Sequence, residues 1–285
     1  MNKICISGIA GFVGSHLSDY LIDKGYEVAG IDNLFTGDIE NVNKKARFYK
    51  EDIRNLEAID KIFKDFKPDW VFHEAANPRT FLSVSDPILN NSINIDGTLN
   101  MLVAARDNGV KRFVSASSCI LNSPNTPYYV SKLAGEEYCN VFNKLYGLST
   151  ISLRYSNVYG SIRQSEKGAS INALASLRKS KRETGRIWIT GNGEQKRDWS
   201  HVVDIARANL LAAKSNVNGY LDICTGVQTT MNEIAKYFDC PIDYIPAEKG
   251  DHMNLSEHQN PLPSLQKIGY EYEIPLNYES IKVYL

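Results

Sequence analysis

A glycine-rich turn near the start of the chain joins an apolar strand to a helix and limits what the N-terminal part can fold into. The run Gly8–Gly14 follows the apolar segment Ile4–Ser7 and leads into the amphipathic segment His16–Ile22. In such a unit the first glycine permits the tight turn, the second lets the backbone approach a phosphate oxygen, and the third lets the helix pack closely on the strand. Free N–H groups at the helix N-terminus then face an anion. The turn therefore predicts a pyrophosphate site made by Gly8, Gly11, Phe12, Val13 and Gly14.

A carboxylate stands where a ribose-binding acid is expected. Asp32 ends a second apolar segment, Glu27–Ile31, and lies 18 residues beyond Gly14, close to the roughly 20 residues of dinucleotide-binding units. It would accept hydrogen bonds from adenosine hydroxyls and repel a 2′-phosphate, so the sequence favours NAD over NADP. The alternative, a turn residue ahead of Asn33, explains the spacing less well.

The composition indicates an ordinary globular protein of one or two domains. The chain has 285 residues, of which 43% are hydrophobic and 23% charged. A net charge of −1 disfavours a nucleic acid or an anionic membrane surface as the main partner. No apolar run reaches the roughly 18 residues of a membrane span, and Met1 leads directly into the first strand instead of a signal peptide, so we expect a cytoplasmic protein.

Cysteine and histidine spacing gives no support for a metal site or a disulfide framework. The five cysteines contain no C-x-x-C pair, and the five histidines are scattered without ligand spacing. We therefore expect reduced, mostly buried cysteines and no catalytic metal.

Strand-like and helix-like segments alternate up to about residue 160, which is typical of right-handed βαβ units in a parallel, doubly wound sheet. The expected strands are 3–7, 27–31, 46–50, 69–73, 111–117 and 149–154. The expected helices are 13–24, 56–65, 88–107 and 128–146. We predict an α/β fold in which residues 1–160 form a Rossmann-like NAD-binding domain.

After Gly160 the alternation of strand-like and helix-like segments gives way to loops rich in charged residues and glycine. We expect residues 161–285 to form mainly a smaller C-terminal substrate-binding lobe, while residues 202–223 return to the first domain. Ligands would then bind between the two parts, at the C-terminal ends of the strands.

A tyrosine and a lysine on one helix face are the best candidates for proton transfer. Tyr128 and Lys132 are four residues apart, and Thr126 and Pro127 suit the start of a helix. A phenol with a pKa of about 10 becomes a base near neutrality only if its anion is stabilised. Lys132, the helix N-terminus and a nicotinamide cation would all act that way.

Spacing alone does not identify this pair, because Tyr20/Lys24 and Tyr278/Lys282 show the same separation. Those two pairs are expected on solvated helix faces. The pair at Tyr128 differs in position, since its helix follows a strand that ends in the hydroxyls of Ser117 and Ser118.

Taken together, the glycine turn, Asp32, the strand-end serine and the Tyr128-x-x-x-Lys132 pair resemble the short-chain dehydrogenase/reductase superfamily. Further segments resemble its extended branch of NAD-dependent nucleotide-sugar epimerases and dehydratases, and the similarity spans nearly the whole chain. These segments are Asp52–Arg54, His73–Ala76, Asn94–Thr98, Arg154–Gly160 and Gly191–Trp199.

The resemblance implies a role for each matching residue. Tyr128 would be the acid and base, Lys132 would tune its pKa and bind the nicotinamide ribose, and Ser118 or Ser117 would contact the sugar oxygen. The other cofactor contacts that it implies are Asn33, Asp52, Ile53, Ala75, Ala76, Asn94 and Tyr155. The substrate contacts that it implies are Arg79, Asn157, Arg197 and Lys249. A turn-capping Asn157 and a surface Arg197 are the structural alternatives.

The residues after Ser118 favour one reaction within this branch. Dehydratases of the branch carry an acidic pair there, whereas this chain has Cys119 and Ile120, so no general acid for elimination is evident. The resemblance then implies 4-epimerisation of a nucleotide sugar, a UDP-hexose first of all, through a 4-keto intermediate with NAD regenerated. A 4,6-dehydratase or a reductase, and a non-enzymatic NAD-binding regulator or scaffold, remain the alternatives.

Two departures from the family pattern concern the substrate. Only ten residues separate Ser118 from Tyr128, and the longer connection usual in the family is missing, so part of the sugar-pocket wall is absent. We therefore expect broad or weak discrimination among sugars. Lys249 lies where a phosphate-binding arginine is common.

The resemblance also implies a homodimer through helices 88–107 and 128–146.

Overall fold

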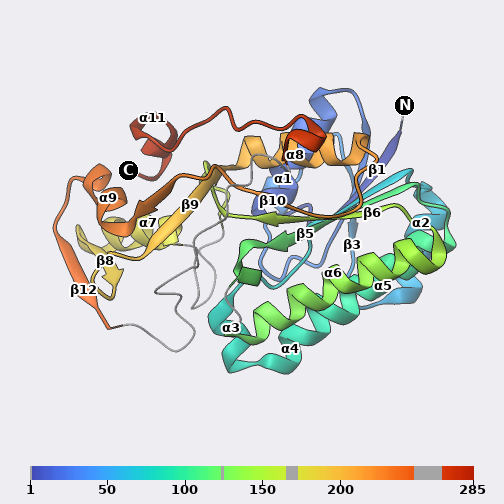
Figure 1. Ribbon diagram of the computed structural model, residues 1–285, viewed down its shortest axis with the longest axis horizontal. Coiled ribbons are helices and arrows are strands. Elements are labelled where there is room, and N and C mark those ends of the chain that lie inside the picture. Colours follow the sequence, from blue (N-terminus) through green and yellow to red (C-terminus); the bar gives the residue numbers. More distant parts are fainter. Residues whose placement is uncertain (1, 123–124, 165–172, 247–264) are drawn as a thin grey trace.

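A seven-stranded parallel sheet forms the centre of the computed structural model, which describes residues 2–122, 125–164, 173–246 and 265–285 (Figure 1). Its order is β10-β6-β5-β4-β1-β2-β3, and every neighbouring pair is parallel. The strands are β1 (Lys3–Ser7), β2 (Glu27–Asp32), β3 (Arg47–Lys50), β4 (Trp70–His73), β5 (Arg112–Ser118), β6 (Thr150–Tyr155) and β10 (Gly219–Ile223). The predicted Rossmann-like, doubly wound architecture is confirmed.

Helices cover both faces of this sheet (Figure 1). On one face α1 (Phe12–Asp23) packs beside α8 (Val202–Lys214), and on the other α2 (Leu56–Phe66), α5 (Gly97–Asp107) and α6 (Pro127–Tyr146) lie side by side. Each face has its own buried apolar layer. The strand order reverses between β1 and β4, and in such sheets the crevice at this switch point is where ligands bind.

Capping residues fix the two ends of α6, as the sequence predicted for its start. The Thr126 side chain accepts a hydrogen bond from the Tyr129 backbone N–H at 3.3 Å, and Pro127 occupies the first turn. Gly147 ends the helix with a φ of 71°, a left-handed conformation that glycine adopts without strain. These caps place Tyr128 in the first turn of the helix.

The segment expected as one α-helix over 88–107 contains a wider turn. It consists of α4 (Pro87–Asn91), the π-helical η2 (Ser92–Asp96) and α5, and α3 (Thr80–Ser85) precedes it. The Asn94 side chain lies inside the wide turn, where it bonds the backbone of Asn77 on both sides and the Ser131 hydroxyl. These tertiary bonds accompany the extra residue in the turn, and helical periodicity in the sequence cannot show them.

A smaller group of elements lies beyond the C-terminal ends of the large sheet's strands (Figure 1). Its sheets have the orders β11-β9-β7 and β12-β8, and its own buried core includes Tyr159, Leu174 and Trp199. The elements are β7 (Asn157–Tyr159), α7 (Ala173–Thr184), β8 (Ile187–Thr190), β9 (Lys196–His201), β11 (Gln228–Thr230), α9 (Met231–Ala235), β12 (Ile242–Ile245) and α11 (Tyr278–Ile281). Short 3-10 turns are η1 (Ile39–Asn41), η3 (Cys119–Asn122), η4 (Lys236–Phe238), η5 (Gln266–Ile268) and η6 (Lys282–Tyr284).

The segment between these small strands rejoins the large sheet. Helix α8 packs on α1, and β10 pairs in parallel with β6 from Gly219↔Ile151 to Ile223↔Tyr155. In the part of the chain that the structure describes, no helix combines the length and the apolar character needed to cross a bilayer.

Candidate active site

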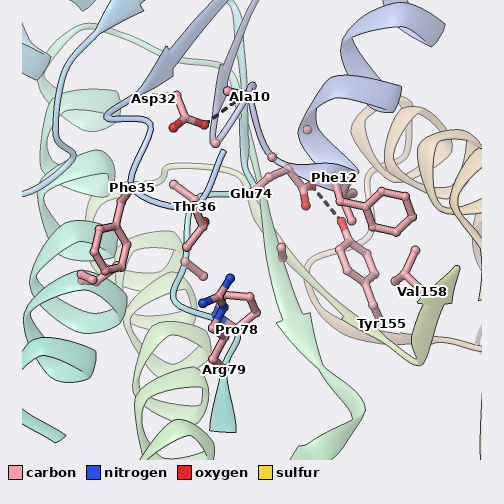
Figure 2. A pocket seen from close by; sticks show the side chains of 18 of the residues that line it. Ala10, Phe12, Asp32, Phe35, Thr36, Glu74, Pro78, Arg79, Tyr155 and Val158 are labelled. Atoms are coloured by element: carbon pink, nitrogen blue, oxygen red, sulfur yellow. Dashed lines mark hydrogen bonds between the residues drawn. The ribbon is translucent and has the colours of Figure 1, made fainter. Parts of the chain in front are cut away.

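A cavity of about 470 Å³ lies at the C-terminal ends of the large sheet's strands. Residues from the glycine turn, from the ends of β2, β4, β5 and β6, from the first turns of α6 and from β7 line it. Figure 2 shows Asp32 with Ala10 in its wall, and Glu74 with Tyr155 in another part of the wall. The volume is within the usual range of small-molecule sites.

The glycine turn has the geometry of an anion site. Gly8 has a φ of 76°, in the left-handed region, and a side chain there would collide with the backbone of Ala75. Gly11 caps α1 without a side-chain hydrogen bond, and the first turn of the helix carries no acid. Hydrogen bonds already engage the N–H groups of Gly8, Ala10 and Gly11, but none among the described residues engages those of Phe12 and Val13 at the start of α1. These helix N-terminal N–H groups are therefore available to an anion.

Two carboxylates lie at the same end of the cavity as the turn. Asp32 accepts backbone hydrogen bonds from Ala10 at 2.9 Å and Leu34 at 2.8 Å, which leaves lone pairs for ribose hydroxyls. Burial raises its pKa, against the effect of these two bonds. Asp52 accepts a bond from the Asn33 amide at 2.9 Å, and the Arg54 guanidinium holds its pKa at about 2. Ile53 lines the cavity beside it.

The candidate proton-transfer groups meet at the ends of β5 and α6. The Tyr128 phenol is 8% exposed and hydrogen-bonds to the Ser118 side chain. The Lys132 ammonium donates to the Ala116 carbonyl at 2.8 Å, and all three of Tyr128, Ser118 and Lys132 line the cavity. This geometry brings together the groups that the sequence proposed for acid–base chemistry.

Burial dominates the charge states of this group. It raises the pKa of Tyr128 to about 12, although the Ser118 bond acts in the opposite direction. It lowers the pKa of Lys132 to about 8, opposed by the negative charges of Glu74 and Glu136. Lys132 is therefore mostly charged at neutral pH. The phenol stays protonated unless a positive charge comes close to its oxygen.

The structure distinguishes the two strand-end serines. The Ser117 hydroxyl donates to Glu136 at 2.6 Å, and Glu136 also accepts two bonds from Arg154, each of 2.8 Å. Ser117 is therefore engaged in a buried ion-pair cluster, whereas Ser118 bonds the phenol. Of the two, Ser118 has the geometry required for contact with a sugar oxygen.

Sequence reasoning gave no role to Glu74, which lines the same cavity. Its carboxylate accepts a hydrogen bond from the Tyr155 hydroxyl at 2.9 Å (Figure 2). That hydroxyl in turn accepts one from the Asn209 amide at 2.7 Å. The signal was the position of Glu74 directly after β4, a strand whose end faces the cavity.

The remaining predicted contacts divide into three groups. Ala75, Ala76, Arg79 and Asn157 line the cavity, although the Asn157 amide is also bonded to the Asp198 carbonyl at 3.1 Å. Asn94 and Arg197 do not line it: Asn94 is buried in the π-helical turn, and half-buried Arg197 donates to the Lys196 carbonyl. Lys249 lies outside the described residues.

The chain's residues fit a dinucleotide. One cavity is lined by the start of α1, whose first N–H groups suit a pyrophosphate, by a carboxylate for ribose hydroxyls and by Lys132. Across the described ranges, no group of three or more His, Cys, Asp and Glu side chains could hold a metal ion.

Fold and site together define a dinucleotide-binding α/β protein equipped to move a proton at one end of its cofactor cavity. The model of the NAD dependent epimerase/dehydratase family matches residues 4–223. The chain belongs to this family, and its cofactor is NAD.

Known members of the family are similar to this chain in sequence and in fold. The chain is 32% identical over 253 residues to UDP-glucose 4-epimerase of Mycolicibacterium smegmatis. This alignment covers 81% of this chain and 80% of the Mycolicibacterium protein. Its structure matches UDP-glucose 4-epimerase of Thermotoga maritima with UDP-glucose, with a TM-score of 0.92, 34% identity and coverage of 99% and 96%. It also matches the Thermus thermophilus UDP-glucose 4-epimerase complex with NAD, with a TM-score of 0.91 and 30% identity. That match covers 99% of this chain and 98% of the Thermus chain.

Proposed function

We propose that this protein epimerises a nucleotide sugar at C4, most readily a UDP-hexose, through a 4-keto intermediate. The observation that carries the proposal is the contact of Tyr128 with Ser118, beside Lys132, in the cavity that also holds the glycine turn and Asp32. The similarity to UDP-glucose 4-epimerases supports the same reaction.

The chain's own residues account for the proton movements. When bound, NAD would supply a reversible two-electron acceptor for the oxidation of the sugar. The Ser118 hydroxyl orients the sugar oxygen. The Tyr128 phenolate, which would form when the positive charge of bound NAD lowers the pKa of the phenol, takes the proton of the 4-hydroxyl. The Lys132 ammonium stabilises the negative charge that Tyr128 and the oxygen share. Once the keto sugar has turned its other face to the cofactor, Tyr128 returns the proton.

The carboxylates of the cavity favour epimerisation over elimination of water. Among the described lining residues they are Asp32, Glu51, Asp52 and Glu74. Asp32 ends β2, and Glu51 and Asp52 follow β3, at the end of the cavity assigned to the adenosine. Glu74 is bonded to Tyr155. No acid follows Ser118, which is succeeded by η3 with Cys119 at its start.

A panel of UDP-, dTDP- and GDP-sugars tests this proposal. We expect NMR to show the C4 epimer of a UDP-hexose as the product, with NAD unchanged at the end of the reaction. A 4-keto-6-deoxy product would mean that the protein is a dehydratase. If no sugar in the panel is turned over, the hypothesis of a non-enzymatic NAD-binding regulator or scaffold replaces the hypothesis of an epimerase.

We assign the diphosphate and sugar to the C-terminal part of the cavity. Asn157 would hold the diphosphate, and Arg79 would stand beside the hexose. The diphosphate contacts of Arg197, which does not line the cavity, and of Lys249 stay predictions from the family resemblance. In this assignment residues 1–160, together with 202–223, bind NAD, and residues 161–285 otherwise form most of the substrate lobe. The reaction is placed in the cytoplasm, where the free cysteines would stay reduced.

We also infer a homodimer through the helices over 88–107 and 128–146. Exposed apolar side chains on α6 support it, since Val141 is 41% and Leu145 70% exposed, and a helix–helix interface would cover them. Light scattering is expected to give about twice the 32.0 kDa of one chain, and Leu145→Arg to give the single-chain mass. The control Val227→Arg, at a 57% exposed apolar residue outside these helices, should leave the mass unchanged. A single-chain mass for the unmodified protein would contradict the dimer.

A further inference from the structure

The mechanism above leaves one carboxylate of the reactive end without a task. Glu74 directly follows β4, is half-buried and lines the cavity. Figure 2 shows its carboxyl group beside Tyr155. A carboxylate in such a setting is costly to keep, which makes its presence informative.

A chain of hydrogen bonds holds this carboxyl in place on one side only. The Tyr155 hydroxyl donates to Oε1 at 2.9 Å, and the Asn209 amide donates both to that hydroxyl, at 2.7 Å, and to the Ile205 carbonyl, at 3.0 Å. No hydrogen bond within the described residues reaches the second oxygen, Oε2. Residues of β6 and α8 thus fix the carboxyl of a cavity-lining residue through one oxygen, and Oε2 has no hydrogen-bond partner among the described residues.

Glu74 lies at the reactive end of the cavity: β4 and β5 pair at His73↔Ser115, so Glu74 is level with Ala116, whose carbonyl accepts the Lys132 hydrogen bond. Its charge and that of Lys132 act on each other: Lys132 lowers the pKa of Glu74, and Glu74 raises the pKa of Lys132. The proton and the electron pair leave the same C–O–H unit of the sugar, so the nicotinamide must lie within reach of Tyr128. Glu74 and Lys132 therefore both act on the place where the oxidised ring carries a positive charge that the reduced ring lacks.

We propose that the Glu74 carboxylate stabilises the oxidised, positively charged cofactor relative to the reduced one and so returns the enzyme to the form that accepts substrate. The proposal rests on the NAD site described above and needs no particular sugar. Attraction between opposite charges in a partly buried site stabilises the charged partner. Tyr155 and Asn209 act here as positioning residues for the carboxyl.

This role depends on pH in a defined direction. Burial raises the pKa of Glu74 to about 7, while the Tyr155 bond and the Lys132 charge oppose the shift. The Asn209 amide that completes the hydrogen-bond chain carries no charge. Burial lowers the pKa of neighbouring His73 to about 3, so His73 is neutral. The preference for oxidised cofactor should therefore be present above pH 7 and disappear as the pH falls below it.

The test is a redox titration of the holoenzyme, in which reduced nicotinamide is followed by its absorbance in the presence of a mediator dye. At pH 8, Glu74→Gln is expected to bind reduced cofactor about tenfold better relative to oxidised cofactor, which is a potential about 30 mV more positive. Below pH 6 the two proteins should agree. Lys132 titrates in both proteins, so the difference between their profiles reports Glu74.

Two further variants separate charge from structure. Glu74→Asp keeps the charge and should restore much of the difference. Tyr155→Phe keeps the carboxylate but removes the bond that lowers its pKa, so the midpoint of the pH profile should move to higher pH. Equal potentials for wild type and Glu74→Gln from pH 6 to pH 8 would overturn the proposal. A holoenzyme that contains no dinucleotide would instead overturn the proposed function.

Discussion

Tyr128→Phe is expected to lower kcat by about 10³–10⁴-fold, the contribution of one well-placed acid–base group. The phenol is 8% exposed, so the phenylalanine ring should fill the same space and the fold should be kept. What disappears is the oxygen that bonds Ser118 and takes the sugar proton. The variant should therefore still contain NAD while epimerising very slowly.

The measurement is the rate of epimer formation by NMR, together with the dinucleotide released on denaturation. The matched control is Tyr129→Phe, one residue away in the same helix turn, because Tyr129 does not line the cavity and is half-buried. It should keep the wild-type rate. Turnover of Tyr128→Phe close to that of the wild type would exclude Tyr128 as the base.

The central sheet was predictable because its inner strands are buried on both faces. Such strands read as short apolar runs between turn residues, as in Ile4–Ser7 ahead of the glycine turn. The six expected strands each lie within two residues of their expected positions, whereas β10 was expected only as part of the returning segment 202–223. The smaller sheets were not predicted element by element. Strands such as β7 and β11 have three residues each, and long-range pairing stabilises them instead of any pattern of their own.

Strand alternation contains more about the site than the sequence interpretation used. Neighbouring residues on a strand point to opposite faces, so Ser117 and Ser118 could not both face the phenol. The same rule separates His73, which hydrogen-bonds Thr98 on the α5 side, from Glu74, which bonds Tyr155. The partners themselves, Glu136 and Tyr155, come from distant parts of the chain, and spacing along the sequence cannot identify them.

The second large effect that we expect is the loss of stability and of NAD when Gly14, in the glycine turn, is replaced by alanine. A Cβ atom on Gly14 would lie 2.2 Å from the carbonyl oxygen of Gly8 and 2.8 Å from its carbon. Both are backbone atoms, so Gly14→Ala must push α1 away from the end of β1. We expect a loss of about 3 kcal/mol of unfolding free energy, the upper end for overpacking. NAD should also be lost, because the N–H groups that face the pyrophosphate move with the helix.

Gly135→Ala is the matched control and should have the opposite sign. Gly135 is also a helical glycine, in α6, but its added Cβ would meet only the Thr98 side chain, at 3.8 Å and 4.0 Å, which is ordinary contact. Replacing glycine by alanine inside a helix then stabilises the fold by about 0.5–1 kcal/mol. Urea unfolding, with and without added NAD, measures both. If Gly14→Ala were as stable as Gly135→Ala and kept its cofactor, the close approach of α1 to β1 would not be what forms the pyrophosphate site.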